Sequence, residues 1–89
     1  MDAGKLENHN IILEDRKKFV LTGVTQVISF DEETIMLETS LGRLVIKGTG
    51  LKILNFEAEI GDLSGEGKVF ALIYTANDNG GGFLSRIFR

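Results

Sequence analysis

The stretch that most constrains the fold runs from Thr34 to Gly48 and reads TIMLETSLGRLVIKG. Two short apolar runs, at residues 35–37 and 44–46, flank a turn that contains Gly42. In each run, side chains two positions apart share one face, which is the periodicity of a β-strand. A short glycine-containing loop between two such runs is typical of a β-hairpin. The stretch therefore predicts a hairpin, and the rest of the chain has the same kind of pattern.

Other strand candidates precede and follow this hairpin. The chain has no proline and eleven glycines, so glycine is expected to supply most of the turns. Gly48-Thr49-Gly50 is expected to break the strand pattern, and the apolar side changes parity near Ile53 and Leu54, which predicts a bulge or bend because one extra residue reverses the inward face. The remaining candidates are residues 10–14, 19–22, 24–30, 51–60, 69–74 and, more weakly, 63–67.

A chain of 89 residues corresponds to one domain. The pattern predicts an all-β fold, a small meander of hairpins that forms a sandwich or an open barrel. The alternative is a short stacked, solenoid-like sheet, because several segments begin at a glycine and end at an aromatic residue. The aromatic residues of these segments are expected in the core: Phe19, Phe30, Phe56, Phe70 and Tyr74.

Composition divides the chain into four parts. Residues 1–8 are polar and expected to be disordered, residues 9–76 form the β domain, residues 77–82 are a glycine-rich linker, and residues 83–89 form an apolar and basic hook. As a short helix, the hook would gather its apolar side chains on one face, away from its arginines. Its target is a partner groove, an acidic membrane surface or the protein's own core. The predicted partner- or membrane-binding residues are Phe83, Leu84, Arg86, Ile87, Phe88 and Arg89.

The segment from Val69 to Tyr74 is apolar at both odd and even positions. Such a strand is buried on both faces or in an interface. Self-association into a homo-oligomer is therefore predicted through Val69, Ala71 and Ile73, together with the exposed side of the 34–48 hairpin, by edge pairing or by an apolar patch.

Candidate chemistry is sparse. The chain has no cysteine and one histidine, so a Cys-based zinc site is excluded, and the acidic turn Asp31-Glu32-Glu33 lacks the spacing of an EF-hand. Gly65-Glu66-Gly67-Lys68 is not a P-loop, because valine follows the lysine where serine or threonine is required. No serine lies in a G-x-S-x-G context. We therefore expect no enzyme, no cofactor, no metal and no small-molecule substrate.

Net charge and hydropathy limit the kinds of partner and the cellular location that the sequence predicts. A net charge of −3 with mixed signs argues against broad non-specific nucleic-acid binding, which needs a basic surface. No apolar run approaches the roughly 20 residues that span a bilayer, and the polar N-terminus lacks the apolar core of a signal peptide, so a cytoplasmic location is expected. A structural protein acting through protein contacts is favoured, and the alternative is a small ligand- or nucleic-acid-binding β module.

The order of several short motifs resembles the YabP family of sporulation proteins, from His9 to the end of the chain. One departure is Ser64-Gly65, where β-favouring residues are expected in the last hairpin of the family. The most specific parts are the run from Leu21 to Asp31 and the tail. The matching residues are His9-Asn10, Arg16, Leu21-Thr22-Gly23-Val24, Val27, Ser29-Phe30-Asp31, Leu37-Glu38-Thr39, Gly42, Leu44-Val45-Ile46-Lys47-Gly48, Leu51, Val69, Leu72, Tyr74 and 82–89.

The resemblance implies a non-enzymatic protein of endospore-forming bacteria, made in the mother cell and needed for spore formation and coat assembly. It implies no catalytic residues. It also implies a membrane-protein partner, YabQ, of the same process. The hook at 83–89 suits recruitment to such a partner or to the membrane surface of the forespore, which would place the protein in the mother-cell cytoplasm, peripheral to that membrane.

Overall fold

The computed structural model describes residues 8–75, and within this range the fold is all-β with no helix. One antiparallel sheet contains six strands in the order β1-β2-β6-β5-β4-β3. The predicted all-β class and its hairpins are therefore confirmed. The strands are β1 (Ile11–Glu14), β2 (Lys18–Leu21), β3 (Val24–Phe30), β4 (Thr34–Thr39), β5 (Gly42–Glu57) and β6 (Asp62–Thr75).

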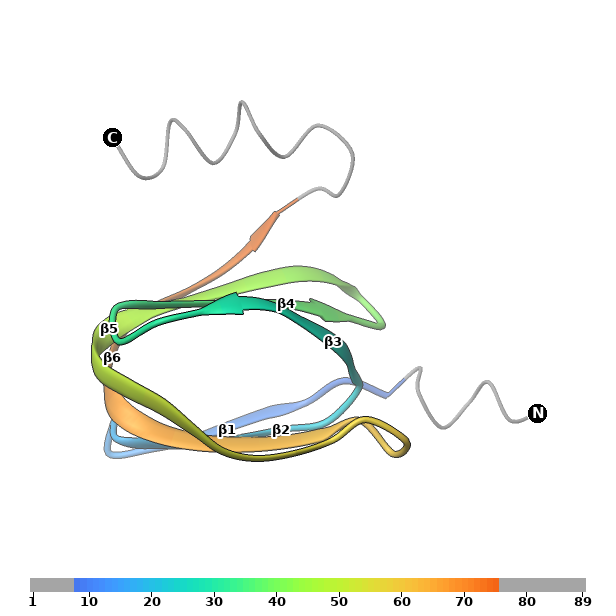
Figure 1. Cartoon of the computed structure of the whole chain (residues 1–89), viewed down its shortest axis with the longest axis horizontal. Helices are drawn as coiled ribbons and strands as arrows, with labels where there is room; N and C mark the ends of the chain where they lie inside the picture. Colours follow the sequence, from blue (N-terminus) through green and yellow to red (C-terminus); the bar gives the residue numbers. More distant parts are fainter. Residues whose placement is uncertain (1–7, 76–89) are drawn as a thin grey trace.

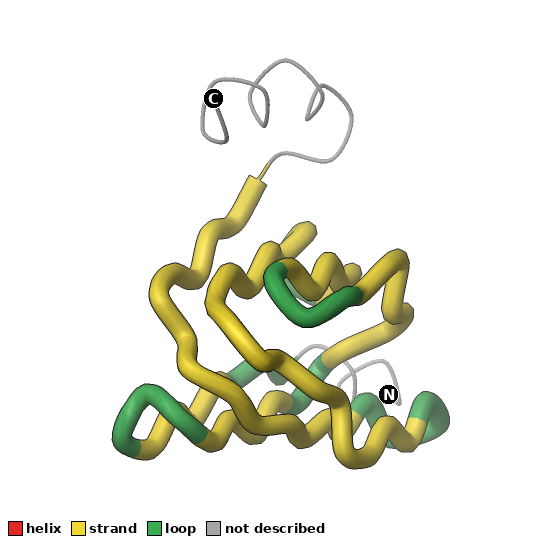
Figure 2. The backbone as a smooth tube through the Cα atoms, turned by 60° about the vertical axis from the view of Figure 1, so that its left-hand side comes forward, coloured by secondary structure: helices red, strands yellow, loops and turns green. Residues whose placement is uncertain are grey.

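The sheet folds over on itself because its two longest strands, β5 and β6, bend and run through both layers (Figure 1). The upper layer of Figure 1 contains β3 and β4 with the first part of β5 and the last part of β6. The lower layer contains β1 and β2 with the remaining parts of β5 and β6. Figure 2 shows the same bent hairpin from another side.

The connection from β2 to β3 contains only Thr22 and Gly23, although these strands belong to different layers. The amide of Thr22 donates to the carbonyl of Asn10 at 3.0 Å, and the amide of Val24 donates to the carbonyl of Gly61 at 3.0 Å. So short a link is possible because the curvature of the sheet brings its two sides together. The sheet nevertheless stays open, with β1 and β3 as its edges.

The bend of the long hairpin lies at Gly67 and at the facing residues of β5. Gly67 has a positive φ of 133°, and a side chain there would come within 2.6 Å of the Gly50 carbonyl oxygen. The pairing of β5 with β6 shifts register between Thr49 and Lys52. The expected break at residues 48–50 is therefore wrong, because β5 bends there without ending. The predicted bulge is confirmed by another register shift in this pairing, between Ile53 and Asn55.

The core fills the space between the two layers. Half-buried apolar residues, among them Ile53 and Phe56, pack against it. Its fully or nearly buried members come from strands β2 to β6: Phe19, Leu21, Val24, Ile35, Leu37, Leu44, Ile46, Leu51, Leu63 and Val69.

Three of the aromatic residues expected in the core are exposed instead. Phe30 is 63% exposed, because it ends an edge strand that carries two register shifts. Phe70 is 55% exposed and lies at the register shift between Val69 and Ala71, which leaves it without a place in the inward alternation. Tyr74 is 45% exposed and lies near the end of the last strand. The prediction was correct for Phe19 and holds in part for Phe56.

Candidate interaction surfaces

The residues predicted for self-association do not share one environment. Val69 is 2% exposed and belongs to the core, whereas Ala71 and Ile73 are half-buried on the outer side of the upper layer. Ala71 and Ile73 are thus the two that lie on an outward face, and self-association through them stays a prediction. The predicted partner- or membrane-binding residues of the hook at 83–89 lie outside the described residues, and their role also stays a prediction.

The upper outer face is the outward side of β4, β5 and β6 in the upper layer, with the apolar residues Met36, Val45, Ala71 and Ile73. Met36 pairs with Val45, and Val45 pairs with Ile73, so an apolar row crosses three strands. Val45 is fully buried but does not belong to the core cluster.

Polar contacts border this row. Arg43 on β5 donates to Glu38 Oε2 on β4 through Nη2 at 2.6 Å and through Nε at 2.8 Å. On the other side, Lys47 Nζ donates to Thr34 Oγ1 at 2.9 Å. The face therefore has an apolar centre and a polar rim, which is the usual arrangement of a protein contact surface.

The lower outer face is the outward side of β1, β2, β6 and β5 in the lower layer. Ile12 pairs with Val20, and Val20 pairs with Ser64 on β6, next to the bulge that contains Leu54. Ile12, Val20 and Leu54 are 58%, 45% and 58% exposed. Three large aliphatic side chains thus lie exposed on one side of this layer.

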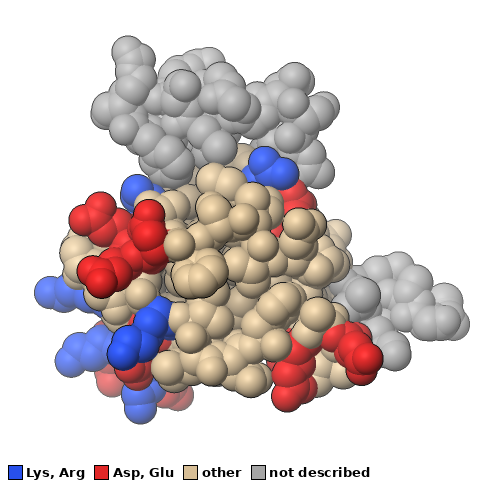
Figure 3. Space-filling model, viewed as in Figure 1, with Lys and Arg blue, Asp and Glu red and all other residues tan. Residues whose placement is uncertain are grey.

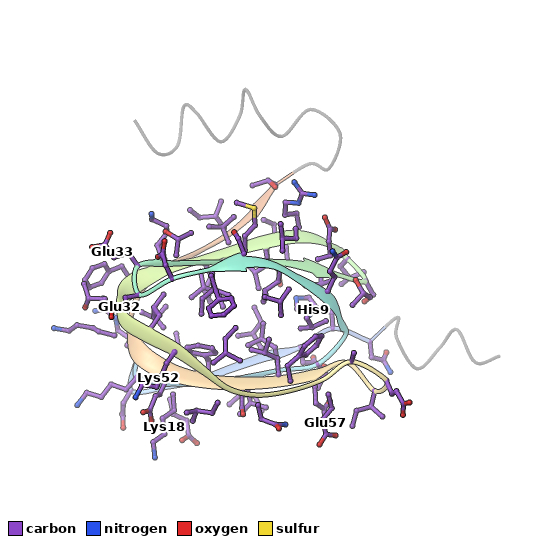
Figure 4. All side chains as sticks on the ribbon, viewed as in Figure 1. His9, Lys18, Glu32, Glu33, Lys52 and Glu57 are labelled. Carbon is purple, nitrogen blue, oxygen red and sulfur yellow. The ribbon has the colours of Figure 1, made fainter. Side chains whose placement is uncertain are left out.

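A basic groove borders the lower outer face. It has a volume of about 370 Å³ and is lined by Lys17, Lys18, Glu66, Gly67 and Lys68. Glu66 pairs across the sheet with Lys18 on one side and with Lys52 on the other. Figure 4 shows Lys18 and Lys52 near one another in the lower layer, and Figure 3 shows basic and acidic side chains intermixed at this end of the molecule.

The two sheet edges are poorly suited to strand pairing with another molecule. Strand β1 has only four residues. Strand β3 has register shifts between Val24 and Gln26 and between Val27 and Ser29. Short edges and bulges are known devices that prevent edge-to-edge association. Contacts between molecules are therefore more favourable through the outer faces of the sheet than through its edges.

His9 joins the start of the described chain to the end of β6. Its Nδ1 lies 2.7 Å from the carbonyl oxygen of Thr22, so Nδ1 carries the proton and donates, and its Nε2 lies 2.5 Å from the hydroxyl of Tyr74. The two rings meet edge to face with centroids 5.6 Å apart. Burial raises the pKa of Tyr74. Figure 4 shows His9 between the layers, where this contact links them.

Asp31 stabilises the turn between β3 and β4. Asp31 Oδ1 accepts from the amides of Glu33 at 2.8 Å and Thr34 at 2.9 Å, and these hydrogen bonds lower the pKa of the Asp31 carboxyl. No group of three or more histidine, cysteine, aspartate or glutamate side chains that could hold a metal ion occurs within residues 8–75. In the same range the structure has no helix that is long and apolar enough to cross a membrane.

Comparison with known proteins identifies the family. The model of the YabP family matches residues 5–81. The chain is also 37% identical over 86 residues to the spore protein YabP of Bacillus subtilis (strain 168), and this alignment covers 93% of the chain and 86% of the relative. The resemblance inferred from the motifs between His9 and the tail is thereby confirmed. The chain belongs to the YabP family, a family of sporulation-related proteins.

Proposed function

We propose that this protein is a non-enzymatic structural or assembly factor of spore formation that acts in coat assembly through self-association and other protein contacts. Its membership of the YabP family supports the link to sporulation. The observation that carries the proposal is the lower outer face, where Ile12, Val20 and Leu54 are about half exposed on one side of the sheet.

Ile12, Val20 and Leu54 form an exposed apolar row that Ser64 interrupts and lysines border, which suits a contact surface. Large exposed apolar patches on soluble proteins mark interaction sites, whereas exposed apolar residues that are scattered singly are common. Isologous contact of this face with a second copy would bury the apolar row twice and cover a large part of the layer. Because the edges at β1 and β3 are short or bulged, we expect contact through the face and not through added strands.

The direct test is the solution mass of the full-length protein, measured by light scattering over a wide concentration range. We expect an oligomer in the wild type and a monomer for Val20→Glu, which places a charge in the apolar row. Gln26→Glu, an exposed position on β3 in the other layer, is the matched control and should keep the oligomer. A wild type that stays monomeric at every concentration would contradict self-association.

A further variant, Ala71→Glu, separates the two outer faces. If Val20→Glu keeps the wild-type mass and Ala71→Glu becomes monomeric, the contact runs through Ala71 and Ile73 on the upper outer face. In a spore-forming host that carries only the variant gene, Val20→Glu should lower the yield of heat-resistant spores, and Gln26→Glu should not. Normal spores in a strain that lacks the protein would contradict the role in spore formation.

A further inference from the structure

Val45 is buried in an unusual place. Its chain neighbours Leu44 and Ile46 belong to the core, so Val45 lies on the opposite, outward side of β5. It is the one fully buried apolar residue within residues 8–75 that the core cluster does not include. Met36 and Ile73 flank it on the neighbouring strands. Full burial of such a residue requires a cover above the sheet.

Thr75 gives an independent indication of the same cover. It pairs with Arg43, two residues along β6 from Ile73, and therefore lies on the upper outer face. It is only 7% exposed, and its Oγ1 is buried with no hydrogen-bond partner among the described residues. Buried hydroxyl groups are almost always hydrogen-bonded. Its partner therefore belongs to something outside residues 8–75.

The cover must come from beyond the described strands. Within residues 8–75 all strands belong to one sheet, and none lies over the upper outer face (Figure 1). The chain continues from Thr75 on this same layer. Residues 76–82 can extend over roughly 23–25 Å, at about 3.3–3.6 Å per residue. Because neighbouring strands are about 4.8 Å apart, the hook at 83–89 can reach any part of β6, β5 and β4 in the upper layer.

We propose that the hook at 83–89 docks on the upper outer face of its own chain and forms a third layer over Val45. The hook offers four large apolar side chains for this apolar row: Phe83, Leu84, Ile87 and Phe88. A short linker holds a segment at an effective concentration in the millimolar range, well above the concentration of a second copy in a dilute solution. Docking within one chain therefore outcompetes docking between copies.

The docked hook has a consequence for the other contacts. It covers Ala71 and Ile73, so self-association through these residues would require the hook to leave the sheet. It also withholds the apolar side chains of the hook from a membrane or a partner protein. The lower outer face stays free for the contacts described under the proposed function, and the two proposals can fail separately.

A single tryptophan can report the docking, because the chain contains none. In full-length Phe88→Trp we expect blue-shifted emission relative to the same protein in denaturant, unchanged from submicromolar to high protein concentration. Adding Ile73→Glu on the upper outer face should shift the emission to the red. Ile60→Glu, at an exposed position in the turn between β5 and β6 and outside both outer faces, is the matched control and should leave the emission unchanged. Circular dichroism verifies folding, and Ala71→Glu replaces Ile73→Glu if the latter unfolds.

Four outcomes would overturn the proposal. Emission equal to that in denaturant would show that the hook does not dock. A blue shift that appears only at high protein concentration would assign the face to a second copy. A blue shift that appears only with vesicles of phosphatidylglycerol and phosphatidylcholine would assign the hook to an anionic membrane. An equal response to Ile60→Glu and to Ile73→Glu, with the sheet folded, would place the hook elsewhere.

Discussion

At the residue scale, the Phe19 ring occupies the space where Gly65 has no side chain. A Cβ at residue 65 would overlap this ring and would come within 2.6 Å of the Lys52 carbonyl oxygen. We expect Gly65→Ala to lower the free energy of unfolding by about 1–3 kcal/mol, because Phe19 is fully buried and has no room to move.

The measurement is the midpoint of urea unfolding, with an unchanged dependence on urea concentration. Ser64→Ala is the matched control on the adjacent, half-buried position and should change the midpoint little. A Gly65→Ala midpoint equal to that of the wild type would contradict the close packing of Phe19 on this strand.

Tyr74 is the only tyrosine, so the ultraviolet absorbance of its phenolate follows one group. Burial raises its pKa, so titration of the folded protein should have a midpoint above the value of 10.0 expected for a free tyrosine. The sign for stability follows from this shift. The contribution of the neutral Tyr74 to the free energy of unfolding is fully present below the pKa of tyrosine in the unfolded chain. It is lost as the pH rises through the higher pKa of Tyr74 in the folded protein. Equal midpoints in native buffer and in denaturant would contradict the burial.

The sequence predicts the burial and the contacts of single residues less well than it predicts the strands. A strand ending in an aromatic residue suggests burial, yet Phe30 lies at a bulged edge, Phe70 at a register shift and Tyr74 close to the end of the last strand. The contact of His9 with Tyr74 joins residues 65 positions apart, and no local pattern predicts it. Such features depend on the register between distant strands.

At the scale of elements, the sequence predicts most strands and one bulge correctly, because alternation and glycine are local signals. It fails at residues 48–50 and at Gly67, where glycine bends a long strand without ending it. Whether a glycine ends or bends a strand depends on the partner that is paired with it. Here β6 continues alongside β5 through the bend, so the hydrogen-bonded ladder resumes on both sides.

The turn between β1 and β2 contains backbone strain that a substitution can relieve. Asp15 and Arg16 have φ values of 53° and 58°, in the left-handed region that non-glycine residues seldom adopt. We expect Asp15→Gly to raise the free energy of unfolding by about 0.5–1 kcal/mol, because glycine adopts this region without a steric cost. Thermal or urea unfolding of the variant measures the gain.

Arg16 provides the comparison for this turn. Its Nε donates to the carbonyl oxygen of Val69 at 3.1 Å. Arg16→Gly relieves the same strain but loses this hydrogen bond, so it should stabilise less than Asp15→Gly does. A destabilised Asp15→Gly variant would show that the Asp15 side chain contributes more than its backbone strain costs.

At the scale of the whole molecule, the sequence does not give the order of the strands. Hairpins between chain neighbours are local, but the pairing of β2 with β6 and the two-residue step from β2 to β3 depend on how the sheet curves. The outer faces follow from that order. Ile12 and Val20 pair within one local hairpin, but Leu54 shares their face only because β6 pairs with β2 on one side and with β5 on the other.

The bent hairpin also predicts how the molecule unfolds. Because β5 and β6 run through both layers, neither layer can lose its strands without exposing the core of the other. We expect one cooperative transition, with coincident unfolding curves from far-ultraviolet circular dichroism and from Tyr74 fluorescence. The sharper test uses Gly65→Ala, whose lesion lies in the lower layer, while Tyr74 reports from the upper layer. Both signals should shift by the same amount, at a fixed protein concentration because any oligomer adds to stability. A Tyr74 curve that keeps its wild-type midpoint while the dichroism becomes biphasic would mean that the two layers unfold separately, despite the strands that they share.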